Sequence, residues 1–215
     1  MAVTVKICGV KSEAALAAAV ANGASALGFN FYPPSPRAID AARARELTGM
    51  VPPGITRVGL FVDAGDETIA EVLAAASLDM LQLHGDETPR RVKDLRRRFG
   101  LPVMKAVKLA SATDVAAADA YLAAADRLLF DAKPPPEKKD ALPGGNAINF
   151  DWSLIAGRSW VLPWLLSGGL NAGNLAAAVA ATGAGAVDVS SGVEDSPGKK
   201  SPEKIAAFLR LAASL

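Results

Sequence analysis

The chain has 215 residues, 51% of them hydrophobic and 21% charged, and 23 Lys and Arg against 22 Asp and Glu give a formal net charge of +1. This balance provides no basic surface for nucleic acid and no polybasic anchor for a membrane. Because the chain has one Cys and one His, it cannot form an intrachain disulfide and has too few ligands for a His–Cys zinc site. The lack of a leader peptide and of a long apolar run predicts a cytoplasmic protein.

Short apolar runs alternate with helical stretches along the whole chain. In the first pair an apolar run ends at Cys8, Ser12 then caps an Ala-rich helix, and Asn22-Gly23 ends that helix. We predict strands over residues 3–8, 26–31, 56–62, 80–83, 103–107, 127–130, 164–166 and 186–189. We predict helices over residues 13–22, 38–47, 66–76, 89–99, 112–124, 174–181 and 202–215, with a further short helix near Asp151.

The sixth predicted strand is followed by a long loop over residues 131–149. This loop contains Pro134-Pro135-Pro136 and Gly144-Gly145. Loops of this length in compact domains are usually functional or disordered. The segment is therefore a candidate for a part of the functional site.

The eight strand–helix pairs predict an α/β protein with a single-domain (βα)8 TIM barrel over residues 1–215. Strands that alternate with helices pair in parallel through right-handed crossovers. The length lies near the lower end of the size range of such barrels, which is roughly 200 to 250 residues. An open doubly wound sheet is the alternative, but it would normally have fewer units and no eighth helix. No shift in composition marks a domain boundary.

Polar and small residues follow most of the predicted strands. In a (βα)8 barrel the carboxyl ends of the strands share one face, and catalytic groups collect there. The strand ends in chain order are Cys8-Gly9, residues 32–37, Asp63, residues 84–87, Lys108, residues 131–133, Ser167-Gly168-Gly169 and Ser190-Ser191-Gly192. The only thiol and the only imidazole thus fall on one face, together with a carboxylate and an arginine.

The turns after the seventh and eighth strands are rich in glycine. Glycine lets backbone N–H groups approach an anion closely, and a following helix N-terminus adds partial positive charge. In these barrels this pair of loops often binds a phosphate group. The turns could also be no more than tight connections, but their place at both strands favours a phosphate site.

Seven segments from the first strand to the loop after the eighth form a specific combination. They are Lys6-Ile7-Cys8-Gly9, residues 28–37 (GFNFYPPSPR), residues 82–87 (QLHGDE), residues 130–133 (FDAK), residues 150–152 (FDW), residues 166–171 (LSGGLN) and residues 187–194 (VDVSSGVE). In this combination the chain resembles the phosphoribosylanthranilate isomerase family, and the resemblance covers essentially the whole chain.

The resemblance implies an Amadori rearrangement of N-(5-phosphoribosyl)anthranilate to 1-(2-carboxyphenylamino)-1-deoxyribulose 5-phosphate in tryptophan biosynthesis, without a metal or cofactor. It implies that Asp131 is the general acid that opens the ribose ring and that Cys8 is the general base that removes the C2 proton. His84, Asp188 and Arg37 would bind the substrate, with Arg37 on the anthranilate carboxylate. The phosphate group would be bound by Gly168, Gly169, Ser190, Ser191 and Gly192. The family includes monomers and homodimers, so the oligomeric state stays open.

The chemistry is consistent with these residue types on their own terms. An acid and a base that act on different sides of one sugar should come from well-separated strands, as the first and sixth are. A free thiol has a pKa of about 8.5, within reach of neutral pH. The iminium formed from the substrate is itself an electron sink, so the reaction needs no added cofactor.

Two positions depart from the pattern of the family. The loop after the sixth strand carries Gly144-Gly145-Asn146-Ala147, where the family usually has Gly-Gly-Thr-Gly or Gly-Gly-Ser-Gly. Pro34 stands where a Lys is common. The first departure bears on how this loop closes over the substrate, and the second stiffens the loop that carries Arg37. Neither removes a proposed catalytic group.

Simpler interpretations compete at each position. Cys8 could be a small buried hydrophobe, His84 could bind a loop carbonyl, Asp131 could cap a turn, and Arg37 could lie on the surface. Among rival functions, a metal-dependent sugar-phosphate epimerase would need several His ligands, and an indole-glycerol-phosphate aldol lyase would need a carboxylate pair. An inert phosphate-binding barrel would have no need of Cys8, Asp131 and Arg37 together.

Overall fold

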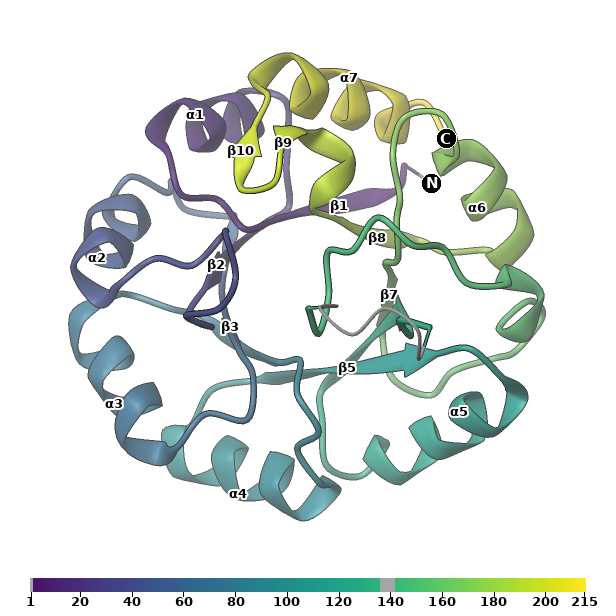
Figure 1. The fold of residues 1–215 in the computed structure, drawn as a ribbon, viewed down its shortest axis with the longest axis horizontal. Coiled ribbons are helices and arrows are strands. Elements are labelled where there is room, and N and C mark those ends of the chain that lie inside the picture. Colours follow the sequence, from purple (N-terminus) through teal and green to yellow (C-terminus); the bar gives the residue numbers. More distant parts are fainter. Residues whose placement is uncertain (1, 136–141) are drawn as a thin grey trace.

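The computed structural model describes residues 2–135 and 142–215, so the part of the predicted long loop from Pro136 to position 141 lies outside the described residues. Eight parallel strands close into a barrel in chain order, and β8 pairs with β1 to complete it (Figure 1). The predicted (βα)8 barrel is therefore confirmed. The strands are β1 (Thr4–Cys8), β2 (Ala26–Asn30), β3 (Thr56–Phe61), β4 (Met80–Leu83), β5 (Val103–Leu109), β6 (Arg127–Ala132), β7 (Trp164–Leu166) and β8 (Ala186–Val189).

The α-helices form a ring around the barrel, and the last of them lies beside the first (Figure 1). They are α1 (Glu13–Ala21), α2 (Ala41–Gly49), α3 (Asp66–Ala75), α4 (Pro89–Phe99), α5 (Ala112–Ala117), α6 (Leu175–Thr182) and α7 (Pro202–Ala213). The described part of the chain also has three short 3-10 helices: η1 (Ala118–Tyr121), η2 (Trp152–Leu154) and η3 (Ser191–Val193). None of the helices in this part is long and apolar enough to cross a membrane.

Three predicted helices differ from those observed. α2 begins three residues later than expected because the Asp40 side chain accepts a hydrogen bond from the Arg43 N–H and caps the helix there. The stretch predicted as one helix over residues 112–124 is α-helical only to Ala117 and continues as η1. The short helix predicted near Asp151 is the single turn η2, and it begins where the Asp151 carboxylate accepts from the Ser153 N–H.

One element has no counterpart among the predicted ones. After β8 the chain forms η3 and then a two-stranded antiparallel hairpin of β9 (Glu194–Ser196) and β10 (Lys199–Lys200). In Figure 1 this hairpin lies inside the ring of helices, between β1 and the pair α1 and α7. The strands are too short and too polar for a period-of-two pattern to reveal them. The hairpin supplies two buried charges to the site described below.

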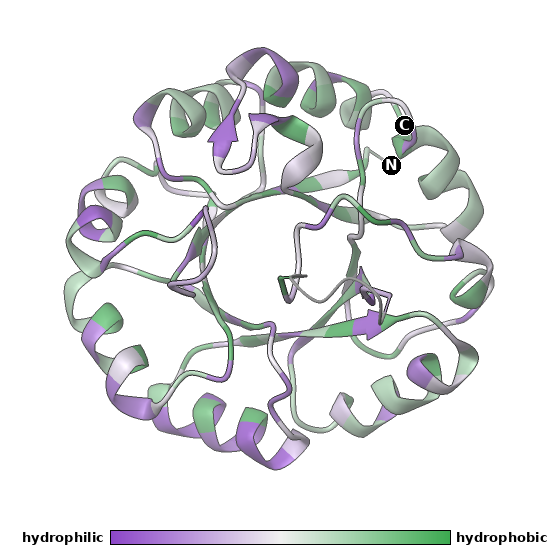
Figure 2. Ribbon diagram, viewed as in Figure 1, coloured by the Kyte–Doolittle hydropathy of each residue, from purple (hydrophilic) through white to green (hydrophobic). Residues whose placement is uncertain are grey.

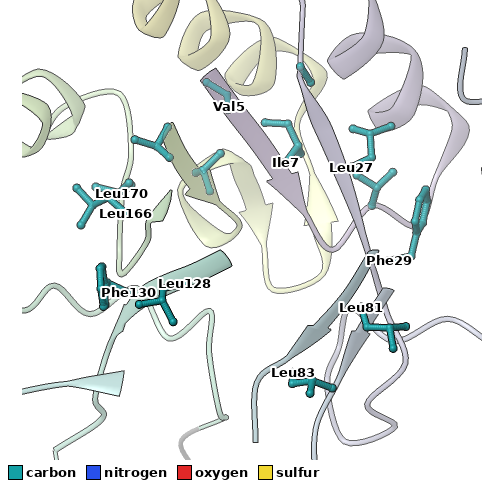
Figure 3. Close-up of a cluster of buried hydrophobic side chains, with 14 of the residues drawn as sticks. Val5, Ile7, Leu27, Phe29, Leu81, Leu83, Leu128, Phe130, Leu166 and Leu170 are labelled. Atoms are coloured by element: carbon teal, nitrogen blue, oxygen red, sulfur yellow. The ribbon is translucent and has the colours of Figure 1, made fainter. Parts of the chain in front are cut away.

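The apolar core has two parts on opposite faces of the barrel wall. Side chains alternate between the faces of a strand, so Val5 and Ile7 of β1 lie in the core between the strands and the helices (Figure 3), while Lys6 and Cys8 take the inner face and line pockets there. Around the barrel, α4 alternates hydrophilic and hydrophobic residues, while α1 and α6 are mostly hydrophobic (Figure 2). A separate cluster lies in the barrel interior toward the amino ends of the strands and borders a cavity there: Val58, Met80, Met104, Ala106, Leu129 and Leu165. The inward positions nearer the carboxyl ends of the strands are polar, and they form the site.

Candidate active site

A pocket opens at the carboxyl ends of the strands and collects residues from distant parts of the chain. Nine of the ten predicted site residues line it: Cys8, Arg37, His84, Asp131, Gly168, Gly169, Asp188, Ser190 and Ser191. The tenth, Gly192, is not part of the lining. It packs against the backbone of Leu170, where a Cβ atom would lie 1.9 Å from the carbonyl oxygen. Gly192 therefore sets the approach of the two glycine-rich turns to each other.

Cys8 lies at the end of β1 with its side chain in the pocket. It is buried, and its pKa is raised by burial, although the ammonium groups of Lys6 and Lys200 act against that rise. Lys6 donates a hydrogen bond from Nζ to Asp188 Oδ1 at 2.6 Å, and both side chains are buried. Asp188 Oδ2 also accepts from Ser167 Oγ at 3.2 Å. The thiol therefore belongs to a buried group of charges at the junction of β1 and β8.

Asp131 lies at the end of β6, and the histidine lies beside it. His84 Nε2 is 3.0 Å from Asp131 Oδ2, and Asp131 Oδ1 accepts from the Ala132 N–H at 2.9 Å. On the other side of the ring, the Gln82 amide nitrogen is 3.0 Å from His84 Nδ1. Gln82, His84 and Asp131 thus form a chain across β4 and β6.

Two glycines of the long loop pack directly on the polar side chains. A Cβ atom at Gly144 would lie 2.7 Å from His84 Nε2 and 2.8 Å from Asp131 Oδ2, and one at Gly145 would lie 2.5 Å from Arg37 Nη1. Only residues without a side chain allow so close an approach. The loop therefore covers the acid side of the pocket.

The two residues after these glycines are where the chain departs from the pattern of the family. Asn146 closes the loop on itself, because its side chain accepts from the Leu142 N–H and donates to the Leu142 carbonyl. Ala147 has a φ of +55°, in the left-handed region that glycine adopts most easily. The loop thus keeps a glycine-like backbone at this position, at a cost of about 1–2 kcal/mol.

Arg37 is buried and its guanidinium is fixed from one side. Nε donates to Glu194 Oε1 and Nη2 to Glu194 Oε2, both at 2.8 Å, in a bidentate pair. Lys200 Nζ also donates to Glu194 Oε1 at 2.6 Å. Burial raises the pKa of Glu194, but the hydrogen bonds and charges of Arg37 and Lys200 lower it by more. The pKa of Glu194 therefore lies below its usual value. Glu194 and Lys200 come from the unpredicted hairpin, and their sequence gave no signal of this role beyond their charge.

Arg37 lines the pocket, and its Nη1–Nη2 edge is not the one that Glu194 binds. On this edge Nη2 donates to the Gly145 carbonyl at 3.2 Å. A ligand carboxylate that binds in bidentate fashion through Nη1 and Nη2 would therefore take the place of the Gly145 carbonyl on Nη2.

The two glycine-rich turns also line the pocket. Gly168 and Gly169 both have left-handed φ angles, of +86° and +63°. The Gly169 carbonyl accepts from the side chains of Asn171 and Asn174. Because the C=O and N–H of a trans peptide point in opposite directions, the next N–H, that of Leu170, is directed away from these amides. Ser190, by contrast, is tied to β1 and β10 through Cys8 O and Lys200 Nζ.

A closed (βα)8 barrel with a thiol and a carboxyl group in one pocket and two glycine-rich turns at its rim defines an enzyme of the acid–base class. The model of one family, described as N-(5'phosphoribosyl)anthranilate (PRA) isomerase, matches residues 5–210. The chain belongs to this family.

Individual proteins of this family match the chain over nearly their whole lengths. The chain is 58% identical to the N-(5'-phosphoribosyl)anthranilate isomerase of Rhodospirillum centenum, covering 100% of both chains. It is similar to the crystal structure of phosphoribosyl anthranilate isomerase from Thermotoga maritima, with a TM-score of 0.88, 38% identity and coverage of 99% and 100%. A second crystal structure of such an isomerase holds reduced 1-(o-carboxyphenylamino)-1-deoxyribulose 5-phosphate, and its TM-score is 0.83 at 36% identity, with coverage of 99% and 100%.

Proposed function

We propose that the protein catalyses the Amadori rearrangement of N-(5-phosphoribosyl)anthranilate to 1-(2-carboxyphenylamino)-1-deoxyribulose 5-phosphate in tryptophan biosynthesis. The observation that carries this proposal is the pocket itself, which brings Cys8 of β1 and Asp131 of β6 together with Arg37. We further expect the enzyme to act in the cytoplasm on this small molecule, without nucleic acid or membrane, and as a monomer or homodimer.

Asp131 and Cys8 divide the proton transfers between them. Asp131 gives a proton to the furanose ring oxygen as the C1–O bond breaks, and the nitrogen lone pair forms the C1=N bond of an iminium ion. Cys8, as the thiolate, then removes the proton from C2, and the C–H electrons form a C1=C2 double bond as the iminium pair returns to nitrogen. The enolamine then takes a proton from water at C1 and releases its enol proton to water, which gives the ketone. Proton transfer through water from the Cys8 thiol to the Asp131 carboxylate restores both groups for the next turnover. His84 supports this assignment, because its hydrogen bond holds Asp131 Oδ2 at a fixed position in the pocket.

The two ends of the substrate have complementary groups in the pocket. The Nη1–Nη2 edge of Arg37 matches a carboxylate in bidentate geometry, which suits the anthranilate end. Gly168, Gly169, Ser190 and Ser191 suit the phosphate end, because backbone N–H groups at left-handed glycines and at the beginning of a helical turn lack intrahelical partners. Gly192 contributes by allowing the two turns to meet. Asp188 acts within the charge group at Cys8, as well as lining the pocket.

The proposal is tested by turnover of purified variants on phosphoribosylanthranilate, which fluoresces through its anthranilate group. Cys8→Ala and Asp131→Asn each remove one proton-transfer partner, so kcat should fall by roughly a hundredfold or more in both. Glu46→Gln is the control, because Glu46 lies on the outer surface of α2 with its side chain 63% exposed. Each variant should also be tested for growth of a bacterium that lacks this step.

Near wild-type turnover by either variant would refute the role given to that residue. If the wild-type protein neither turns over this substrate nor restores growth, the proposed reaction is wrong, and an inert phosphate-binding barrel becomes the better description.

A further inference from the structure

A lysine lies inside the barrel, below the pocket. Lys6 is 1% exposed and points inward from the middle of β1, where Asp188 is its direct partner in the register of β1 with β8. A buried ion pair is often no more stable than apolar residues of similar volume. The barrel interior beneath is lined by apolar side chains around a cavity that Lys6 also borders, so an apolar residue would suit this position for stability alone. The charge at Lys6 therefore calls for a functional explanation.

The Lys6 ammonium group lies beside the thiol. Lys6 and Cys8 are two residues apart on β1 and share its inner face, so the ammonium group and the thiol lie on the same side of the strand. Gly28 of β2 is the register partner of Cys8, and a Cβ atom there would lie 3.0 Å from both Cys8 Sγ and Lys6 Nζ. The missing side chain at Gly28 thus leaves the space in which the two groups meet.

We propose that Lys6 is a positioning residue for the base: its ammonium group, anchored by Asp188, stabilises the thiolate form of Cys8. This inference rests on the proposed function, in which Cys8 acts as the base. A thiol surrounded by apolar groups would remain protonated, and a cation in contact with the sulfur favours the thiolate. Asp188 has two opposing effects, because it holds the ammonium group in place while its own negative charge disfavours the thiolate.

The charges around Cys8 come from several elements. Burial raises the pKa of the thiol, Lys6 lowers it more than any other charge does, Asp188 raises it, and Lys200 of β10 lowers it. The other charged or titratable side chains of the same pocket are Tyr32, Arg37, His84 and Asp131. Lys6 is the cation that offsets burial most directly, since its Nζ and the sulfur border the same space at Gly28 and its charge has the largest opposing effect on the pKa of the thiol.

The experiment measures the thiolate directly, without substrate. Cys8 is the only cysteine of the chain and lines the pocket, so iodoacetamide alkylation followed by mass spectrometry of the intact protein reports on it alone. Alkylation rates are compared at pH 8 and over a pH series for wild type, Lys6→Met, Asp188→Asn and the double variant. Thermal melting identifies any variant that fails to fold, and the double variant removes the charge without leaving an unpaired buried carboxylate.

The proposal predicts opposite effects for the two single variants. Lys6→Met should raise the pH midpoint of alkylation by about one unit or more, which slows alkylation at pH 8 at least about threefold after the gain in nucleophilicity of a more basic thiolate. The double variant should change in the same direction. Asp188→Asn should lower the midpoint. An unchanged or lower midpoint in Lys6→Met, or in the double variant if the single variant does not fold, would overturn the inference.

A second readout separates this inference from the proposed function. If Cys8 is the base, the rising limb of the kcat/KM–pH profile should move with the alkylation midpoint in each variant. An alkylation midpoint that moves as expected while the kcat/KM profile stays fixed would support Lys6 as the partner of the thiolate and refute Cys8 as the base. A fixed alkylation midpoint in both Lys6 variants would instead refute the role of Lys6 and leave the proposed reaction intact.

Discussion

At the scale of single residues, the site depends on charges that are themselves held by buried partners. Arg37 is bound along one edge by Glu194, which is in turn bound by Lys200. A guanidinium fixed in this way loses little further side-chain freedom when a carboxylate binds to its other edge. Its orientation is therefore set before the substrate arrives.

The first prediction concerns Arg37 itself. Arg37→Ala should raise KM by about ten- to a hundredfold, because a charge-assisted bidentate contact of about 1.5–3 kcal/mol is lost. The effect on kcat should be smaller, since Arg37 takes no part in proton transfer. Steady-state kinetics measure both constants, and an unchanged KM would remove Arg37 from substrate binding.

A second prediction follows for its partner in the hairpin. Glu194→Gln keeps the shape of the side chain but removes the charge that orients the guanidinium, so KM should rise by about three- to tenfold. Asp195→Asn is the matched control, because this neighbour is half exposed and pairs with Lys204 at the surface. Equal KM values for the two variants would show that Glu194 does not position Arg37.

Nine of the ten site residues named from the sequence line one pocket, but the residues that hold them in place were not named. Cys8, His84 and Asp131 stand at strand ends, where the barrel topology alone brings them together. The roles of Lys6 and Glu194 could not be predicted from their positions along the chain. Each is a charged residue next to an apolar one, a pattern that is equally typical of the protein surface. Their partners are Asp188 and Lys200, and in each case the pairing depends on register or on a hairpin that local sequence does not specify.

At the scale of elements, the loop over the pocket contributes through its backbone. A methyl group at Gly144 would collide with the His84–Asp131 pair. Gly144→Ala should therefore lower kcat by at least about tenfold, because small displacements of a catalytic group are costly. Gly49→Ala is the control, since nothing lies within 4 Å of a Cβ atom there. Wild-type kcat in Gly144→Ala would mean that the loop does not press on the acid during turnover.

All eight strands could be predicted because each is a short apolar run bounded by turn residues or by a helix cap. The errors lie at boundaries and in irregular elements. The bridge of Ala38 with Asn30 delays α2, and η1 replaces the last turns of the predicted fifth helix. Hydrophobic periodicity does not separate a 3-10 turn from an α-helical one, because both bury the same side chains over so few residues.

At the scale of the whole molecule, a buried carboxylate joins three consecutive units of the barrel. Glu87 accepts from the N–H groups of Asp63 and Gly85 and from Lys105 Nζ at 2.8 Å. It therefore ties the loop after β3 and the loop after β4, which follows His84, to β5. This link lies outside the pocket and serves to hold the loops together.

The last prediction tests this link. Lys105→Met leaves the Glu87 carboxylate buried without its cation and should lower the free energy of unfolding by about 3 kcal/mol or more. Lys108→Met is the control on the same strand, because Lys108 pairs at 3.4 Å with Asp86, whose side chain is 92% exposed. That pair should contribute less than about 1 kcal/mol. Urea denaturation at neutral pH compares the two, and equal losses would contradict the assignment.

The division of the apolar core into two parts has a consequence for how such an enzyme can change over time. Substitutions between the barrel wall and the helices can accumulate without touching the inward-facing layer that bears Lys6 and Asp188. Thermal stability can therefore change through many positions of the outer core, while the inner layer is constrained by the chemistry of the site. To make the enzyme more stable, substitutions should be made between the barrel wall and the helices, and the inward-facing residues of the barrel should be left unchanged.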